Sequence, residues 1–306
     1  MSQPLLVIIT GPTATGKTAL AIELARQYDA EIVSADSRQV YRYLDIGTAK
    51  PALAQRQAVP HHLVDVVNPD EQFDSARFRS LALAAIEEIL QRGKRVLVVG
   101  GTGLYLRALT HGLFAGPAAD PALRTRLREQ EQSGGKGFLH RWLREVDPDA
   151  ANRLHPNDIV RLIRALEVFL TTGKPMSRWQ REHGFRGRPF ATLTIGLVCE
   201  RETLHRRIAE RCQQMMREGL VDEVRRVWDI GYGPELPVMR TIGYAQIKAL
   251  LHGQCSEADA LARMTTETKR LAKRQLTWFR AEPDLRWFAP SQGREVAAVI
   301  GRFWES

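Results

Sequence analysis

The sequence predicts an α/β fold, a parallel sheet flanked by helices, with an all-helical domain inserted into it. Strand-like apolar runs alternate with helical patterns over the first third of the chain. A glycine-rich loop at residues 11–18 joins one such run to a helical pattern. From residue 116 to residue 188 the patterns are helical, and a further strand-like run follows. These observations indicate a P-loop NTPase-like core that is interrupted by a helical segment.

The first third supplies three predicted strands and two helices. Residues 5–9 are all apolar and predict a buried strand, and residues 18–25 predict the helix that follows it. A second strand is predicted over residues 30–35 and a third over residues 95–99. Between them, residues 74–92 carry apolar side chains at helical spacing.

The glycine-rich loop is the most informative motif. It fits the pattern G-x-x-x-x-G-K-[ST], in which backbone N–H groups bind a di- or triphosphate. The order strand, loop, helix places the positive end of the helix dipole on the phosphates. The loop predicts a bound diphosphate group and does not specify ATP; a glycine turn without a ligand is the alternative. The predicted phosphate-binding residues are Gly11, Pro12, Thr13, Ala14, Thr15, Gly16, Lys17 and Thr18.

The pattern changes near residue 115, where a turn-rich stretch begins. Residues 159–170 form an amphipathic helical pattern that stops before Gly173, and residues 191–198 predict a strand that returns to the sheet. The predicted domains are therefore a core at residues 1–115 and 189–306 and a helical insertion at residues 116–188. The last third is predicted to be mainly helical, with a long helix around residues 257–279.

Composition indicates a globular protein with a polyanionic partner. The chain has 306 residues, 44% hydrophobic and 26% charged, and a formal net charge of +9. Residues 1–120 carry 12 basic and 12 acidic side chains, whereas residues 121–190 carry 14 and 8. A phosphate pocket does not require this excess, but a nucleic acid would use it; a basic surface that only serves solubility is the alternative.

The chain is expected to be cytoplasmic. No apolar run reaches the roughly 18 residues that a membrane span needs, and no export signal is apparent at the N-terminus. The three cysteines, Cys199, Cys212 and Cys255, lie far apart and form neither a metal-binding pair nor a disulfide framework.

Two further loops are predicted to share the rim of the ligand crevice, because they follow parallel strands. Asp36 follows the second strand and lies in a polar cluster with Ser37, Arg38 and Gln39. Its carboxylate could bind Mg²⁺ through water, act as a general base, or cap a helix. Residues 100–103 contribute three glycines that allow close backbone approach. The strand before them ends without the acidic residue that many P-loop NTPases use to hold Mg²⁺, which weakens an ATPase or kinase interpretation.

Two basic segments could contact nucleic acid. Residues 268–280 hold five basic side chains beside Trp278 and Phe279, and aromatic rings can stack on splayed bases. Arg161 and Arg164 lie three residues apart on one predicted helix face. Solvated helix faces with core aromatics are the alternative for both.

Taken together, the motifs resemble those of the bacterial tRNA dimethylallyltransferases, also called tRNA isopentenyltransferases. The resemblance covers nearly the whole chain. It is carried by G-P-T-A-T-G-K-T at 11–18, D-S-R-Q-V-Y-R at 36–42, G-T-A-K-P at 47–51, G-G-T-G-L-Y at 100–105, M-M-R-E-G-L at 215–220, T-I-G-Y at 241–244 and K-R-Q-L-T-W-F-R at 273–280.

The resemblance implies that a dimethylallyl group is transferred from its diphosphate to N6 of the adenine 3′ of the anticodon, in tRNAs that read codons starting with U. It implies that the helical insertion grips the anticodon stem-loop, and we expect a monomer. The catalytic residues would be Asp36 as general base, Thr102 and Arg217 on the diphosphate, and Lys17 on the leaving group. Mg²⁺ would be held by the Thr18 hydroxyl.

The same resemblance predicts the residues that contact tRNA. They are Asp36, Ser37, Arg38, Gln39, Val160, Arg161, Leu162, Ile163, Arg164, Arg240, Thr241, Ile242, Gly243, Tyr244, Ala245, Lys273, Arg274, Gln275, Leu276, Thr277, Trp278, Phe279 and Arg280. Two other functions remain open at this point. One is a P-loop small-molecule kinase that uses ATP, and the other is a non-enzymatic RNA-binding module with a regulatory nucleotide site.

Overall fold

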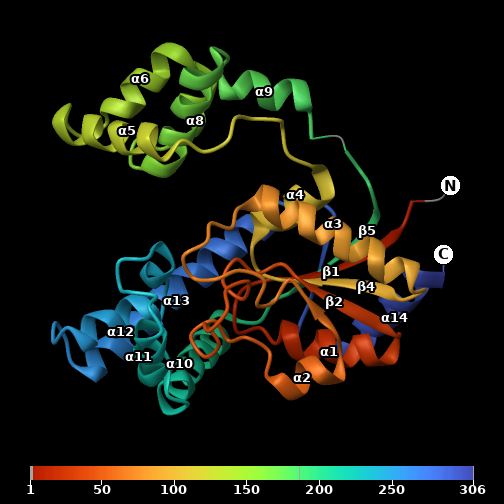
Figure 1. Cartoon of the computed structure of the whole chain (residues 1–306). Coiled ribbons are helices and arrows are strands. Elements are labelled where there is room, and N and C mark those ends of the chain that lie inside the picture. Colours follow the sequence, from red (N-terminus) through yellow and green to blue (C-terminus); the bar gives the residue numbers. More distant parts are fainter. Residues whose placement is uncertain (1–2, 186, 306) are drawn as a thin grey trace. The chain divides into compact units, whose positions relative to one another are not determined.

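The computed structural model describes residues 3–185 and 187–305. Contacts between Cα atoms divide the chain into two compact units, Met1–Thr110 with Arg188–Ser306, and His111–Gly187. The first division falls at the end of a helix, a few residues before the expected position, because the turn-rich stretch after it packs with the second unit. Figure 1 shows the helices and strands of both units.

Unit 1 is built on a six-stranded sheet with the strand order β3-β2-β4-β1-β5-β6. Every neighbouring pair of strands runs parallel. The fold class predicted from the sequence, a P-loop NTPase-like parallel sheet flanked by helices, is confirmed. The strands are β1 Leu5–Thr10, β2 Ala30–Ser34, β3 His61–His62, β4 Arg95–Val99, β5 Ala191–Leu197 and β6 Leu285–Phe288.

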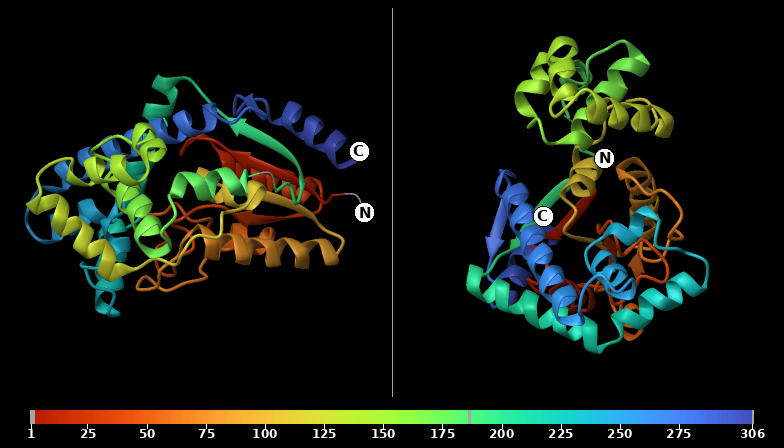
Figure 2. Two further views of the ribbon diagram at one scale, coloured as in Figure 1. Left: turned by 90° about the horizontal axis from the view of Figure 1, so that it is seen from above. Right: turned by 90° about the vertical axis from the view of Figure 1, so that its left-hand side faces the viewer.

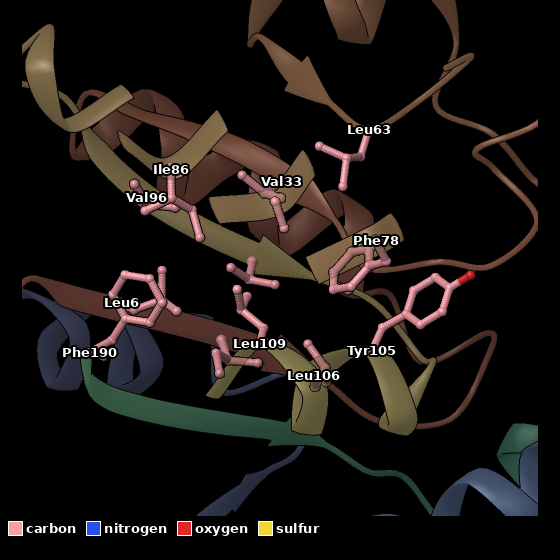
Figure 3. Close-up of a cluster of buried hydrophobic side chains, with 14 of the residues drawn as sticks. Leu6, Val33, Leu63, Phe78, Ile86, Val96, Tyr105, Leu106, Leu109 and Phe190 are labelled. Carbon is pink, nitrogen blue, oxygen red and sulfur yellow. The ribbon is translucent and has the colours of Figure 1, made fainter. Parts of the chain in front are cut away.

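Alternating side chains of the strands build two separate cores, one on each face of the sheet. One core packs Leu6, Val33 and Val96 against apolar residues of the helices α3 and α4. In Figure 3 the rings of Phe78 from α3 and Tyr105 from α4 lie together, with centroids 4.3 Å apart and planes at 12°. The opposite core packs the intervening strand residues against α1 and α14. The helices of these two layers are α1 Lys17–Gln27, α3 Ser75–Gln91, α4 Gly103–His111 and α14 Gly293–Glu305.

A third group of helices packs around a separate buried cluster in unit 1. The long helix α13 lies against α10 and α12, and both views in Figure 2 show α10 and α13 side by side. The helices and one 3₁₀ turn of this part are α10 Arg201–Arg217, α11 Leu220–Asp229, η1 Pro237–Arg240, α12 Tyr244–Leu251 and α13 Glu257–Arg280. The short helix α2 Leu53–Ala58 has no buried residue and contributes nothing to this cluster.

Helices joined by loops make up unit 2, and no strand occurs in its described residues. Its core is formed by leucine and alanine side chains from four helices, with Leu127, Leu143 and Leu166 among the most buried. Asp120 begins α5 and Asp158 begins α8 by accepting backbone N–H groups, and Gly173 ends α8 in a left-handed conformation. The helices are α5 Pro121–Ser133, α6 Phe138–Val146, α7 Pro148–Arg153, α8 Ile159–Thr172 and α9 Met176–His183. Within the residues that the structure describes, no helix is long and apolar enough to cross a membrane.

A buried carboxylate, Glu167, organises unit 2. Its side chain is fully buried and accepts hydrogen bonds from Arg124 at 2.7 and 2.8 Å, from Arg164 at 2.6 Å and from the Asp120 N–H at 2.8 Å. Burial acts to raise the pKa of Glu167, but these hydrogen bonds outweigh it and lower the pKa to about 2.

We expect Glu167→Gln to destabilise unit 2 by about 3 kcal/mol, because it leaves two arginines without their shared anion. Because the pKa of Glu167 is lower in the folded chain, its stabilisation is complete above pH 4.5 and is lost as the pH falls toward 2. At pH 7, where the unaltered chain has the full stabilisation, hydrogen–deuterium exchange in α5 and α8 should be faster in Glu167→Gln than in the unaltered chain, and exchange in α3 should be the same in both. Unaltered protection of α5 and α8 would contradict this role.

Candidate active site

The phosphate loop connects β1 to α1, as the sequence predicts. Gly11 has φ +128°, and a Cβ there would lie 2.4 Å from the Leu197 carbonyl oxygen on the neighbouring strand. Gly16 begins the helix with φ +90°. Gly11 therefore has to be glycine both for its backbone conformation and for its close contact with Leu197, and Gly16 for its backbone conformation alone.

A cavity of about 930 Å³ opens beside this loop, within unit 1. Residues 13–18 of the loop line it, together with Asp36 and Gln39 after β2 and Gly100 and Gly101 after β4. The loops that follow three parallel strands thus meet at one cavity, as the sheet topology requires. Helix α10 supplies a further wall.

Lys17 brings positive charge to the cavity. Its Nζ donates to the Pro12 carbonyl at 2.7 Å. Burial and the nearby guanidinium of Arg211 lower the pKa of Lys17 to about 8, and Asp36 opposes this shift. Two cations close together in a buried cavity are stabilised by a bound anion, so the electrostatics favour a phosphate-bearing ligand.

Asp36 lies in a tight turn at the cavity. Its Oδ1 accepts the N–H groups of Arg38 at 2.8 Å and Gln39 at 3.4 Å. The Thr102 hydroxyl accepts the Ser37 N–H at 3.1 Å and so joins this turn to the loop after β4. Thr102 lies at the start of α4 and is not among the residues that line the cavity. Because the Thr102 oxygen is the acceptor in its hydrogen bond with Ser37, its hydroxyl proton can donate to another group.

Helix α10 carries basic residues that the sequence analysis missed. Arg207 and Arg211 line the cavity together with Gln214 and the predicted Arg217. The Nε of Arg211 is buried and has no hydrogen-bond partner among the described residues, and burial lowers its pKa. Arg217, at the end of the helix, donates to Gln214 at 2.8 Å. The spacing of four, three and three residues places these side chains on one helix face, a signal that the sequence contained.

Several predicted tRNA-contact residues remain at the surface of their own unit. Val160 is 78% exposed, and Arg161 is exposed beside Asp158. Arg38 and Arg240 are exposed as well. In α13 the exposed members are Lys273, Arg274, Thr277 and Arg280.

Four other predicted contact residues need correction. Leu162 and Ile163 belong to the core of unit 2, and Phe279 belongs to a sheet core of unit 1, so their buried side chains cannot touch RNA. Arg164 is half-buried, and its guanidinium donates hydrogen bonds to Glu167 and to the Pro117 carbonyl, so it is already paired within the protein. The half-buried members are Thr241, Ile242, Ala245, Gln275, Leu276 and Trp278.

Tyr244 and Gly243 were also predicted to contact tRNA, but both are buried inside unit 1. The Tyr244 hydroxyl donates to Glu223 at 2.6 Å, and burial raises the Tyr244 pKa. The Glu223 carboxylate, 3% exposed, also accepts three backbone N–H groups, of residues 45, 46 and 47, at 2.7 to 3.1 Å. This carboxylate fixes the start of the segment that carries Thr48, Ala49 and Lys50 to the cavity wall.

We expect Tyr244→Phe to lower the free energy of unfolding by about 1 kcal/mol, the contribution of one hydrogen bond. Its affinity for tRNA should stay within about twofold of that of the unaltered chain, because the ring is buried. Urea unfolding and an RNA-binding titration would measure both, with the exposed Arg240→Ala as the matched variant. A large loss of RNA affinity with unchanged stability would restore Tyr244 as a contact residue.

The chain is similar in sequence to several known proteins. A family model described as IPP transferase matches residues 39–282. A protein named tRNA dimethylallyltransferase 2 from Syntrophus aciditrophicus is 49% identical over 99% of this chain and 97% of its own length. A tRNA dimethylallyltransferase from Geobacter metallireducens is 52% identical over 98% of this chain and 97% of its own length.

The fold is also similar to those of solved structures. The tRNA isopentenylpyrophosphate transferase of Bacillus halodurans superposes with a TM-score of 0.73 at 38% identity, covering 99% of this chain and 97% of that one. A eukaryotic dimethylallyltransferase acting on tRNA superposes with a TM-score of 0.78 at 30% identity, covering 94% and 74%. The family predicted from the sequence motifs is confirmed, and the chain belongs to the IPP transferase family.

Proposed function

We propose that this chain transfers a dimethylallyl group from dimethylallyl diphosphate to N6 of the adenine 3′ of the anticodon in tRNAs that read codons starting with U. Diphosphate is the second product. One observation carries the proposal beyond the family relationship: a phosphate loop, a carboxylate and a row of arginines line the same cavity. That combination suits the departure of a diphosphate and the removal of a proton from the attacking amine.

In the proposed reaction N6 of the adenine attacks the first carbon of the dimethylallyl group while the bond to the diphosphate oxygen breaks. Lys17 and N–H groups of the phosphate loop stabilise the negative charge that grows on the leaving group. Arg217 and Thr102 orient it. Asp36 accepts the proton from N6. The adenine has to leave its base stack to reach the cavity, at a cost of a few kcal/mol.

Mg²⁺ fits this site as a partner of the diphosphate. Within residues 3–185 and 187–305 no group of three or more His, Cys, Asp and Glu side chains is arranged to hold a metal ion. The Thr18 hydroxyl lines the cavity, and Asp36 is a carboxylate nearby. Mg²⁺ commonly takes few ligands from the protein and the rest from substrate phosphates and water. Thr18 would hold the ion, which would supply further positive charge to the leaving group.

The RNA would be held by exposed residues of both units, most of them basic. In unit 2 the insertion would grip the anticodon stem-loop with Val160 and Arg161, and in unit 1 the exposed residues of α13 would contact the backbone. Every residue that lines the cavity comes from unit 1 of one chain, so a monomer supplies the whole diphosphate site. A tRNA substrate places the enzyme in the cytoplasm.

The kinase alternative is not favoured. The relatives are named for prenyl transfer to tRNA, and β4 ends in Val99 and Gly100 without an acidic residue for the metal.

The test is a mass measurement on RNA. The purified chain is incubated with Mg²⁺, dimethylallyl diphosphate and an unmodified tRNA whose anticodon is followed by adenines. We expect the mass of one dimethylallyl group to be added at that adenine. We also expect pyrophosphate to inhibit the reaction and ATP not to inhibit it. An unchanged RNA together with ATP turnover on small acceptors would contradict the proposal and favour the kinase.

A further inference from the structure

Gln275 connects the two glycine-rich loops at the cavity. It lies in α13 and its side chain is half-buried. Its Oε1 accepts the Thr13 N–H at 2.9 Å, and its Nε2 donates to the Gly101 carbonyl at 3.0 Å. A single amide therefore bridges the phosphate loop after β1 and the loop after β4. Gln275 is separated in sequence by 262 residues from Thr13 and by 174 residues from Gly101. The resemblance to the family had predicted Gln275 as an RNA contact.

The fit of this amide leaves no spare room. A Cβ at Gly101 would lie 2.3 Å from Gln275 Nε2. One helical turn further along α13, a Cβ at Gly103 would lie 2.1 Å from Nε1 of Trp278. Gln275 and Trp278, three residues apart, present the same face of the helix to the loop. The glycines at 101 and 103 are thus explained by contact with α13 as well as by access to a ligand.

One of the hydrogen bonds of Gln275 also determines where an N–H group of the phosphate loop points. Thr13 belongs to the loop residues predicted to bind phosphate, but its N–H points to Gln275. Thr13 and Gly101 both line the cavity, so the amide fixes two of its walls relative to each other. A loop that is held in place before the ligand arrives loses less conformational entropy on binding.

We infer that Gln275 is a positioning residue for the diphosphate site, which holds the phosphate loop and the Gly100–Gly103 loop in register, and that it is not an RNA contact. The inference rests on the proposed function, because it takes a diphosphate as the ligand of the cavity. A hydrophobic isostere, Gln275→Met, removes both hydrogen bonds while keeping the length of the side chain. Lys273→Met, an exposed position on the same helix, is the matched control.

The test measures the binding of inorganic pyrophosphate with Mg²⁺ by calorimetry and the binding of tRNA by anisotropy, on the full chain. For Gln275→Met we expect pyrophosphate affinity to fall about tenfold, as the loss of one or two hydrogen bonds predicts. Its tRNA affinity should stay within about twofold of that of the unaltered chain. Lys273→Met should show the reverse, with weaker RNA binding and unchanged pyrophosphate binding.

Gly101→Ala approaches the same contact from the other side. It should weaken pyrophosphate binding by a similar factor, because the new methyl group displaces the Gln275 amide. Combined with Gln275→Ala, which removes the obstruction, Gly101→Ala should cause little further loss, so that the two changes are not additive.

Two outcomes would overturn the inference in different ways. If Gln275→Met binds pyrophosphate normally but loses tRNA affinity, Gln275 is an RNA contact and the proposed function still stands. If the unaltered chain itself does not bind pyrophosphate, the diphosphate site fails, and the inference fails with it. A folding check by circular dichroism accompanies each variant, and Gln275→Glu provides a second variant that keeps the acceptor for Thr13.

Discussion

Asp36→Asn should lower the rate of dimethylallyl transfer about 1,000-fold and leave tRNA affinity within about twofold, because a general base contributes roughly 100- to 10,000-fold. The structure shows why asparagine is the informative replacement. Asp36 Oδ1 holds the turn through the N–H groups of Arg38 and Gln39, and an amide oxygen can accept the same two hydrogen bonds. The turn survives, whereas the ability to take a proton from N6 is lost.

Single-turnover rates and an RNA-binding titration would separate these effects. Asp70→Asn is a suitable control, because Asp70 is an exposed carboxylate that lines no part of the cavity. The control should retain both rate and affinity. If Asp36→Asn instead weakens RNA binding while kcat is preserved, Asp36 recognises the base and another group accepts the proton.

Lys17→Met should lower kcat/KM for dimethylallyl diphosphate by roughly 100- to 1,000-fold, the usual effect of removing one donor to a developing anion. Lys17 is the cation within the phosphate loop itself, and the methionine side chain keeps its length without the charge. The loss should fall more on the chemical step than on RNA binding, since the negative charge grows on the leaving group as the bond breaks.

Steady-state kinetics with varied donor and a fixed tRNA concentration would test this expectation. Lys94→Met provides the comparison, because Lys94 pairs with Asp29 near the start of β4, at the edge of the sheet opposite the cavity. Lys94→Met should leave kcat/KM nearly unchanged. A Lys17→Met chain with normal kcat/KM would show that the arginines of α10 carry the leaving group without help from the loop.

The local elements of the core were predictable because their patterns are strong. Short apolar runs marked β1 and β4, strand-like sequences with interspersed polar residues marked β2 and β5, and helical spacing marked α3, α8 and α13. β3 and β6 could not be found in the same way. β3 consists of His61 and His62 alone, and it becomes a strand only because it pairs with Ile32 and Val33 of β2. β6 is four residues long and exists by pairing with β5.

The fold class, the family and the main chemical groups of the candidate site could all be predicted from the sequence. These follow from residue types at short, regular spacings, which set the local backbone and place a phosphate loop, a carboxylate turn and a glycine loop at the ends of parallel strands. It also contained the helical spacing of the α10 arginines.

The motifs did not predict which of their residues face the cavity or solvent and which pack inside the protein, because this depends on how the whole chain folds. Tyr244 is buried on Glu223, Arg164 is paired with Glu167, and Gln275 bridges two loops. Glu223 and the two loops lie on other elements than Tyr244 and Gln275, and Glu167, three residues from Arg164 on α8, is itself held by Arg124 of α5. Burial and hydrogen-bond partners arise from contacts between segments distant in sequence, so a motif specifies which side chains are present but not what each of them touches.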